Sequence, residues 1–217
     1  MDPAHAQNTG YARSKYVAEH ITRNAMRNAR APAHVLRIGQ LVGDTVVGEW
    51  NATEGVPMMI QTAVTLGALP MLDESTAQLP LLSSWPEVAE SGKPSDPAPS
   101  SDVVYHVLNP QRFHWTRDML ISLAKAGLEF ESLPTDRWME RLRSSDRDPV
   151  KNPPIKLLGW FESKYGHGKS AAQSGGLVYQ TGDTRNKSKT LRNVPDVTDV
   201  GFVQLMLGRL RKHWGQH

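Results

Sequence analysis

Tyr11 and Lys15 are the residues of this chain whose types and spacing best suit proton-transfer chemistry. They stand four positions apart in a stretch typical of a helix, so both side chains project from one helical face. A phenol is a weak acid at neutral pH, and a nearby ammonium group stabilises its phenolate, as general acid–base catalysis requires. The same spacing also occurs in ordinary surface pairs, so the flanking sequence must decide between the two interpretations.

The elements around this pair are typical of an α/β protein. Asn8 or Thr9 can cap a helix from about Tyr11 to Ala29, since apolar residues recur at helical spacing and no proline intervenes. A short β-branched strand, His34–Ile38, follows and stops at Gly39. We expect a second strand at Asp102–Leu108, because this run is also rich in β-branched residues.

The rest of the chain divides into a loop and a mostly helical half. Prolines and serines crowd residues 79–101, which predicts a flexible loop. Further helices are expected over residues 56–69, 117–126, 137–143, 155–165 and 200–214. We therefore assign residues 1–110 to an α/β part and residues 111–217 to a helical part.

Composition excludes several classes of protein. The chain has 217 residues, a formal charge of +3 and no cysteine, so disulfide scaffolds, thiolate metal sites and cysteine nucleophiles are excluded. His106 and His114 have no second ligand at metal spacing, and we expect no metal site. Neither a targeting signal nor a long apolar segment is visible, so we expect a cytoplasmic protein that does not cross a membrane.

The C-terminal region is basic, which raises the alternative of a binding module. Basic side chains attract phosphate, but here they accompany no nucleic-acid motif and no interleaved aromatic residues, so we expect no nucleic-acid partner. The basic residues are Arg185, Lys187, Lys189, Arg192, Arg209, Arg211 and Lys212.

An ordered set of short sequence matches extends over nearly the whole chain. The segment that begins with Gly10-Tyr11 and ends with Ala18-Glu19 matches the pattern GYxxSKxxAE, and Leu36–Gln40 supplies the next strand and turn. The matches continue through Arg37–Asp44, Trp50–Glu54, Gly67–Pro70, Val104–Pro110, Phe113–Trp115 and Ser188–Leu191. On these residues the chain resembles the thioester reductase domains that terminate fungal nonribosomal peptide synthetases and related adenylate-forming reductases. Such domains are extended short-chain dehydrogenase/reductases.

The resemblance implies a fold, a reaction and a set of site residues. The fold would be an NAD(P)-binding Rossmann-type sheet, present here only in its C-terminal part, with a mostly helical C-terminal substrate domain. NADPH would reduce a thioester carried on the phosphopantetheine arm of a carrier domain to an aldehyde or alcohol. Tyr11 would donate the proton and Lys15 would hold the nicotinamide ribose, and both would contact the cofactor. Ile38, Gly39, Gln40 and Leu41 would border the nicotinamide.

One expected motif is absent from the sequence. A dinucleotide site needs a glycine-rich turn between a strand and a helix, whose amides face the pyrophosphate. Gly39–Gly43 does not have the GxGxxG spacing, and Gly168-Lys169-Ser170 lacks the earlier glycine of a P-loop. We therefore expect the C-terminal part of a reductase, inactive alone. The alternative is a non-catalytic remnant or interaction module that pairs with an N-terminal partner chain or with a carrier domain.

Overall fold

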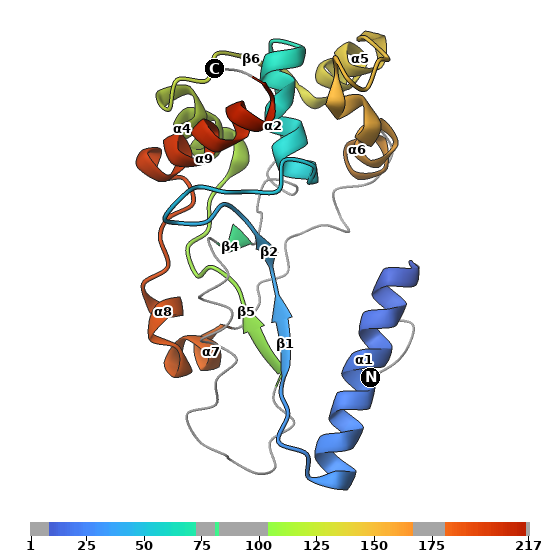
Figure 1. Ribbon diagram of the computed structural model, residues 1–217, viewed down its shortest axis with the longest axis vertical. Helices are drawn as coiled ribbons and strands as arrows, with labels where there is room; N and C mark the ends of the chain where they lie inside the picture. Colours follow the sequence, from blue (N-terminus) through green and yellow to red (C-terminus); the bar gives the residue numbers. More distant parts are fainter. Residues whose placement is uncertain (1–8, 73–80, 83–103, 167–180, 216–217) are drawn as a thin grey trace. The chain divides into compact units, whose positions relative to one another are not determined.

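The computed structural model describes residues 9–72, 81–82, 104–166 and 181–215 (Figure 1). These residues form two compact units, each built from segments distant in the sequence. The first unit takes its described elements from residues 1–39, 86–110 and 179–193, and the second from residues 40–85, 111–178 and 194–217. The units thus follow other boundaries than a division at residue 110. The assignment of 1–110 to cofactor binding and 111–217 to substrate binding stays a prediction.

The first unit begins with the long helix α1, Gly10–Ala29. Thr9 caps it, because its side-chain oxygen accepts a hydrogen bond from the amide of Ala12 at 3.1 Å. Arg30 ends the helix in the left-handed region, at φ 51°. The helix predicted from the apolar spacing and from the Thr9 cap is confirmed.

Two parallel strands form the sheet in the described residues of this unit. Strand β1, Val35–Ile38, pairs with β5, Val104–Val107, in the register Val35↔Val104 to Ile38↔Val107. Figure 1 shows α1 running alongside this pair. The short helices α7, Gly182–Lys187, and α8, Lys189–Arg192, belong to the same unit. The predicted α/β class is confirmed, because parallel strands with a flanking helix are its hallmark.

The second unit is mostly helical and contains two further pairs of parallel strands. Strand β2, Gln40–Leu41, pairs with β4, Leu81–Leu82, while β3, Ala68–Met71, pairs with β6, Glu131–Pro134. The helices are α2 (Gly55–Thr65), the π-helix η2 (Trp115–Met119), α4 (Leu120–Lys125), α5 (Thr135–Ser144), the 3₁₀-helix η3 (Pro153–Leu157), α6 (Leu158–Tyr165) and α9 (Val200–His213). The predicted helical character of the C-terminal half is thus confirmed, with β6 as an addition.

The helix expected over residues 56–69 is shorter than predicted. Helix α2 ends at Thr65, and Gly67 follows with a φ of +67°, where glycine is the favoured residue. Residues 68–71 then form β3, whose partner β6 lies 63 positions further along the chain at Ala68↔Glu131. The expected helix was wrong at its C-terminal end, because a continuous apolar run is compatible with either a buried helix or a buried strand.

The hydrophobic core lies in the second unit. Its largest fully buried side chains include Trp115, Trp138 and Phe161. The Trp115 indole donates to the carbonyl of Pro70 at 2.8 Å, and the Trp138 indole donates to the hydroxyl of Thr62 at 3.0 Å. Both indoles are therefore satisfied inside the core, as buried donors must be.

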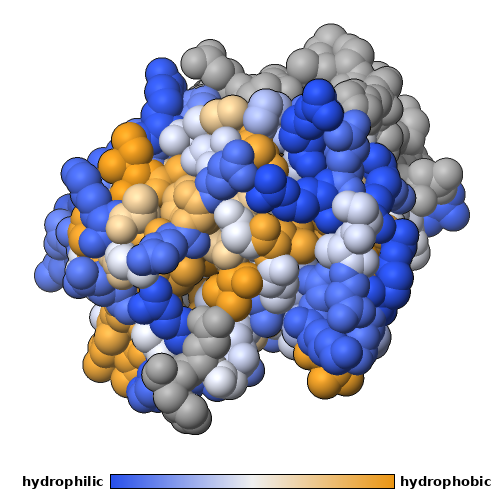
Figure 2. All heavy atoms as spheres, turned by 90° about the horizontal axis from the view of Figure 1, so that it is seen from above, coloured by the Kyte–Doolittle hydropathy of each residue, from blue (hydrophilic) through white to orange (hydrophobic). Residues whose placement is uncertain are grey.

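Apolar side chains also remain on the surface. Val46, Ile121 and Val150 are exposed by 78%, 51% and 84%. Figure 2 shows hydrophobic residues in patches among hydrophilic ones on one face of the molecule. No helix among the described residues is long and apolar enough to cross a membrane. The proline-rich stretch 79–101, apart from β4, and the Gly168–Ser170 motif lie outside the described residues.

Candidate functional site

Tyr11 and Lys15 lie together on the first turns of α1. The Lys15 ammonium nitrogen is 5.3 Å from the centroid of the Tyr11 ring. Tyr11 is 74% exposed, so its hydroxyl is accessible from solvent. The intervening Ser14 hydroxyl donates to the carbonyl of Tyr11 at 2.8 Å, which accounts for it as a bond within the helix. The structure thus brings the predicted phenol and amine side by side.

The two side chains open onto a cleft between α1 and β1 within the first unit. The cleft has a volume of about 520 Å³. From α1 it is lined by Tyr11, Lys15, Ala18, Glu19 and Thr22, and from β1 and the residue before it by His34, Val35, Leu36, Arg37 and Ile38. A phenol, an ammonium group and the end of a parallel strand therefore share one concave surface, the usual setting of a ligand site.

The predicted cofactor loop is split between the two units. Ile38 lines the cleft with Tyr11 and Lys15. Gly39 continues the strand pairing, because its amide donates to the carbonyl of Val107 at 3.1 Å. Gln40 and Leu41 form β2 in the second unit, where the side-chain amide of Gln40 donates to the Glu54 carboxylate at 3.3 Å. The structure therefore brings Tyr11, Lys15 and Ile38 together, and it assigns Gln40 and Leu41 to a different compact unit.

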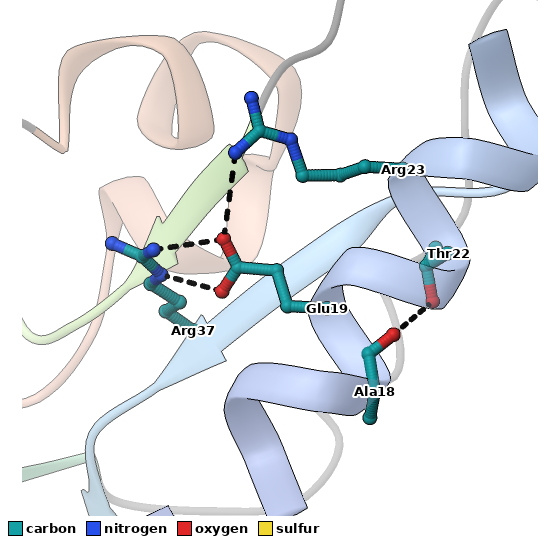
Figure 3. A network of polar contacts seen from close by, with 5 residues as sticks. All are labelled: Ala18, Glu19, Thr22, Arg23 and Arg37. Carbon is teal, nitrogen blue, oxygen red and sulfur yellow. Dashed lines mark hydrogen bonds and ion pairs between the residues drawn. The ribbon is translucent and has the colours of Figure 1, made fainter. Parts of the chain in front are cut away.

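A polar network crosses the cleft from helix to strand (Figure 3). Arg37 donates to Glu19 through two nitrogens, Nε at 3.1 Å and Nη2 at 2.8 Å. Arg23 Nη1 lies 3.9 Å from the same carboxylate. Glu19 and Arg37 both lie in the matched segments of the sequence, but no role was predicted for either residue. The sequence feature that could have predicted their contact is an acidic residue two helical turns after Tyr11, followed by a basic residue on the next strand.

The second strand contributes an ionisable side chain beside Arg37. His106 is the register partner of Arg37 across the parallel pair. Burial and the Arg37 guanidinium lower the pKa of His106 below its ordinary value of 6.5, while Glu19 acts in the opposite direction. Protonation of this imidazole is therefore disfavoured beside the positively charged guanidinium of Arg37.

The donor set in the cleft suits the ribose end of a nicotinamide nucleotide. The Lys15 ammonium offers three donors and the Tyr11 hydroxyl can donate or accept, so both can bind sugar hydroxyls. A cleft of about 520 Å³ accommodates a group of that size. Among the described residues, no cluster of three His, Asp or Glu side chains could hold a metal ion. The Tyr11 hydroxyl and the Lys15 ammonium can form hydrogen bonds and transfer protons at this site.

Comparison with known proteins gives a match for the segment that contains this site. Residues 1–84 match a family model of NAD-binding proteins described as male sterility protein. The chain is 33% identical over 189 residues to clavatol synthase claF of Penicillium crustosum. This alignment covers 85% of this chain and 7% of that protein. The chain thus spans less than a tenth of the length of this curated relative.

Two solved structures share the fold. The terminal R domain from the myxalamid PKS-NRPS biosynthetic pathway matches with a TM-score of 0.75 and 25% identity, over 99% of this chain and 52% of that chain. A thiolation-reductase di-domain from an archaeal nonribosomal peptide synthetase matches with a TM-score of 0.67 and 18% identity, over 95% of this chain and 41% of that chain. The chain is therefore similar to about half of a terminal reductase domain.

Proposed function

The chain belongs to the terminal reductase domains of polyketide and nonribosomal peptide synthetases, an NAD-binding family, and we propose that it is the C-terminal part of a thioester reductase. In this proposal it contributes the proton-transfer side chains and the substrate region. The observation that supports it most directly is the juxtaposition of Tyr11, Lys15 and Ile38 around one cleft.

Tyr11 is the proton donor in the proposed reaction. Reduction of a thioester places negative charge on the carbonyl oxygen, and a phenol within hydrogen-bond reach neutralises that charge by giving up its proton. Lys15, beside the Tyr11 ring, stabilises the phenolate that remains. Collapse of the resulting hemithioacetal breaks the carbon–sulfur bond and leaves a thiol and an aldehyde. A second round of the same chemistry would give the alcohol.

NADPH is the proposed cofactor, and it supplies the hydride when bound. Lys15 and Tyr11 would hold the ribose next to the nicotinamide, and Ile38 to Leu41 would border the ring. This sequence contains no GxGxxG turn for the pyrophosphate. We therefore propose that an N-terminal half, on the same polypeptide or on a partner chain, provides that part of the site.

The proposed substrate is an acyl or peptidyl thioester on the phosphopantetheine arm of a carrier domain. One structural neighbour is a thiolation-reductase di-domain, and clavatol synthase claF is many times longer than this chain. Both facts support a domain that acts on a thioester delivered by a neighbouring carrier. Binding to an acidic carrier would weaken as salt concentration rises, because surface charge attraction is screened.

Turnover of a model thioester tests the proposed function. The chain is assayed alone and joined to the N-terminal half of a related reductase domain, with NADPH, an acyl-phosphopantetheine thioester and detection at the nicotinamide absorbance. We expect turnover only in the joined protein, and we expect Tyr11→Phe and Lys15→Met to lower kcat by about 100-fold or more. Tyr16→Phe is the matched control on the same helix. Undiminished kcat in Tyr11→Phe, or turnover by the isolated chain at the rate of the joined protein, would contradict the proposal.

A further inference from the structure

We infer that Glu19 and Arg37 are positioning residues, which fix the helical face of Tyr11 and Lys15 over the end of strand β1. This role rests on the proposed function, since it assigns a task to two further residues of the same cleft. Neither residue is required to touch substrate or cofactor. They act through the geometry that they impose on the phenol and the amine.

Glu19 occupies the same face of α1 as the proposed catalytic pair. It follows Lys15 by four positions and Tyr11 by eight, so the three side chains form one stripe along the helix. All three line the cleft. A contact that fixes the Glu19 carboxylate therefore also fixes the orientation of the helical face that carries Tyr11 and Lys15.

Arg37 holds the other end of the contact on the strand. It immediately precedes Ile38, which lines the cleft, and stands two positions before Gly39. Its guanidinium donates to Glu19 through Nε and Nη2 at 3.1 and 2.8 Å, so the pair is bidentate. A bidentate pair fixes orientation as well as distance, unlike a single contact between point charges.

Helix α1 has little apolar packing that could fix its position on the sheet without the contact between Glu19 and Arg37. None of its 20 residues, all of which the structure describes, is buried. Val17 and Ile21 are exposed by 53% and 65%. The Glu19 side chain, in contrast, is only 13% exposed, so its contact with Arg37 is partly shielded from water. Shielding makes a charged contact stronger than one in open solvent.

The other charged groups around this contact are compatible with the role. Arg23, one turn further along α1, brings a nitrogen to 3.9 Å from the Glu19 carboxylate. Burial and the guanidinium lower the pKa of His106, the register partner of Arg37 on β5, and so disfavour a second positive charge there. Within the described residues Arg37 thus meets the Glu19 carboxylate across the cleft, and Arg23 provides a second, more distant cation for that carboxylate.

The position of α1 on the sheet can be measured directly in this chain. Because the sequence contains no cysteine, spin labels attach only where cysteines are introduced. Ser14→Cys on α1 and Asn186→Cys on α7 place both labels in the first unit at exposed positions. Pulsed electron paramagnetic resonance then gives the distribution of distances between them. We expect Glu19→Gln to broaden this distribution and to add a component at longer distance.

Three further variants separate positioning from a general loss of structure. Arg37→Lys keeps the charge and removes the bidentate contact, so the width of its distance distribution should lie between those of the wild type and Glu19→Gln. Arg23→Gln is the matched control and should stay as narrow as the wild type. The charge-reversed pair Glu19→Lys with Arg37→Glu should narrow the distribution again, whereas lost packing would not be rescued in this way. Circular dichroism establishes that each variant is folded.

Two results would overturn the inference. One is a distance distribution in Glu19→Gln that is as narrow as that of the wild type. The other is a distribution in the charge-reversed pair that is as broad as those of the single variants. If Glu19→Gln does not fold, Arg37→Lys decides, and a wild-type distribution there counts against the role. In the joined reductase Glu19→Gln should lower kcat by about 10-fold or more with the KM for thioester little changed, and Arg23→Gln should leave both unchanged. The distance measurement needs neither cofactor nor thioester, so its failure is distinguishable from failure of the proposed reductase function.

Discussion

At the scale of single residues, two tyrosines of this chain differ in environment and therefore in chemistry. Tyr11 is 74% exposed and lies beside the Lys15 ammonium group. The Tyr165 hydroxyl is buried and has no hydrogen-bond partner among the described residues. Burial raises the pKa of Tyr165 to about 12, because the phenolate would lose its hydration there. Burial therefore suppresses ionisation of Tyr165, whereas Tyr11 is open to solvent.

The raised pKa of Tyr165 predicts a loss of stability in alkali. The folded state holds this proton up to pH 12 or so, whereas the unfolded chain releases it near pH 10, so stability is complete below pH 10 and falls as pH rises toward 12. We expect this effect to reach up to about 3 kcal/mol. Urea unfolding of wild type and Tyr165→Phe at pH 8 and pH 11 measures it.

The comparison at pH 8 is the control for the effect of Tyr165→Phe at pH 11. At pH 8 it should match or slightly exceed the stability of the wild type, because the variant removes a buried hydroxyl that lacks a partner. At pH 11 it should lose less stability than the wild type. Equal losses in the two proteins would show that Tyr165 ionises in the folded state as readily as in the unfolded chain.

At the scale of elements, Thr62 connects helix α2 to two other parts of the second unit. Its hydroxyl accepts a hydrogen bond from the Trp138 indole of α5 at 3.0 Å. Its own hydrogen can go to the carbonyl of Met59 at 2.7 Å or to that of Ala68, in β3, at 2.9 Å. Thr62 and Trp138 are both completely buried. One hydroxyl thus satisfies a core donor where helix and strand meet.

Thr62→Val should therefore destabilise the protein despite its equal size. The substitution leaves the Trp138 indole without an acceptor in the core, which costs about 1–3 kcal/mol. Urea unfolding followed by tryptophan fluorescence measures the free energy. Thr65→Val, one turn along the same helix, is the matched control, because the Thr65 hydroxyl has no partner within the described part of the chain. Similar losses in the two variants would contradict the assignment.

The local sequence predicted elements well where caps and periodicity agreed. Thr9 and the apolar spacing defined α1, and the β-branched runs defined β1 and β5. It failed at β3 and β6, which both contain proline and are held by a pairing between distant segments. Proline normally argues against a strand interior. Only tertiary pairing reveals that residues 68–71 are not the end of a helix.

The same distinction applies to the candidate site. Tyr11 and Lys15 could be found because four residues of separation on a helix fix their relation. The contact between Glu19 and Arg37 joins two elements across 18 positions, and no short pattern encodes it. Gln40 and Leu41 were predicted with Ile38 from the resemblance to reductase domains, in which the loop after this strand borders the nicotinamide. The boundary between compact units nevertheless falls at residue 39, and their role at the nicotinamide stays a prediction.

At the scale of the whole molecule, the two units differ in how completely they are packed. The core cluster lies in the second unit, where α2 alone buries eight residues. In the described part of the first unit the sheet has two parallel strands, which is a marginal structure in water without further packing. The solved terminal R domain covers 99% of this chain, yet the chain covers only 52% of that domain. The weaker packing falls in the unit that contains the proposed catalytic pair.

This difference predicts unequal protection of the helices from hydrogen exchange. Local opening costs least where few apolar contacts are lost, so the amides of α1 should exchange about 10-fold or more faster than those of α2. Mass spectrometry of peptides after timed exchange measures both helices in one sample, with α9, which buries five residues, as the internal reference for a packed helix. Joining the chain to an N-terminal reductase half should slow exchange in α1 and leave α2 unchanged, because Val17 and Ile21 would then be covered. Protection of α1 equal to that of α2 in the isolated chain would mean that polar contacts such as that of Glu19 with Arg37 hold the helix as firmly as a packed core.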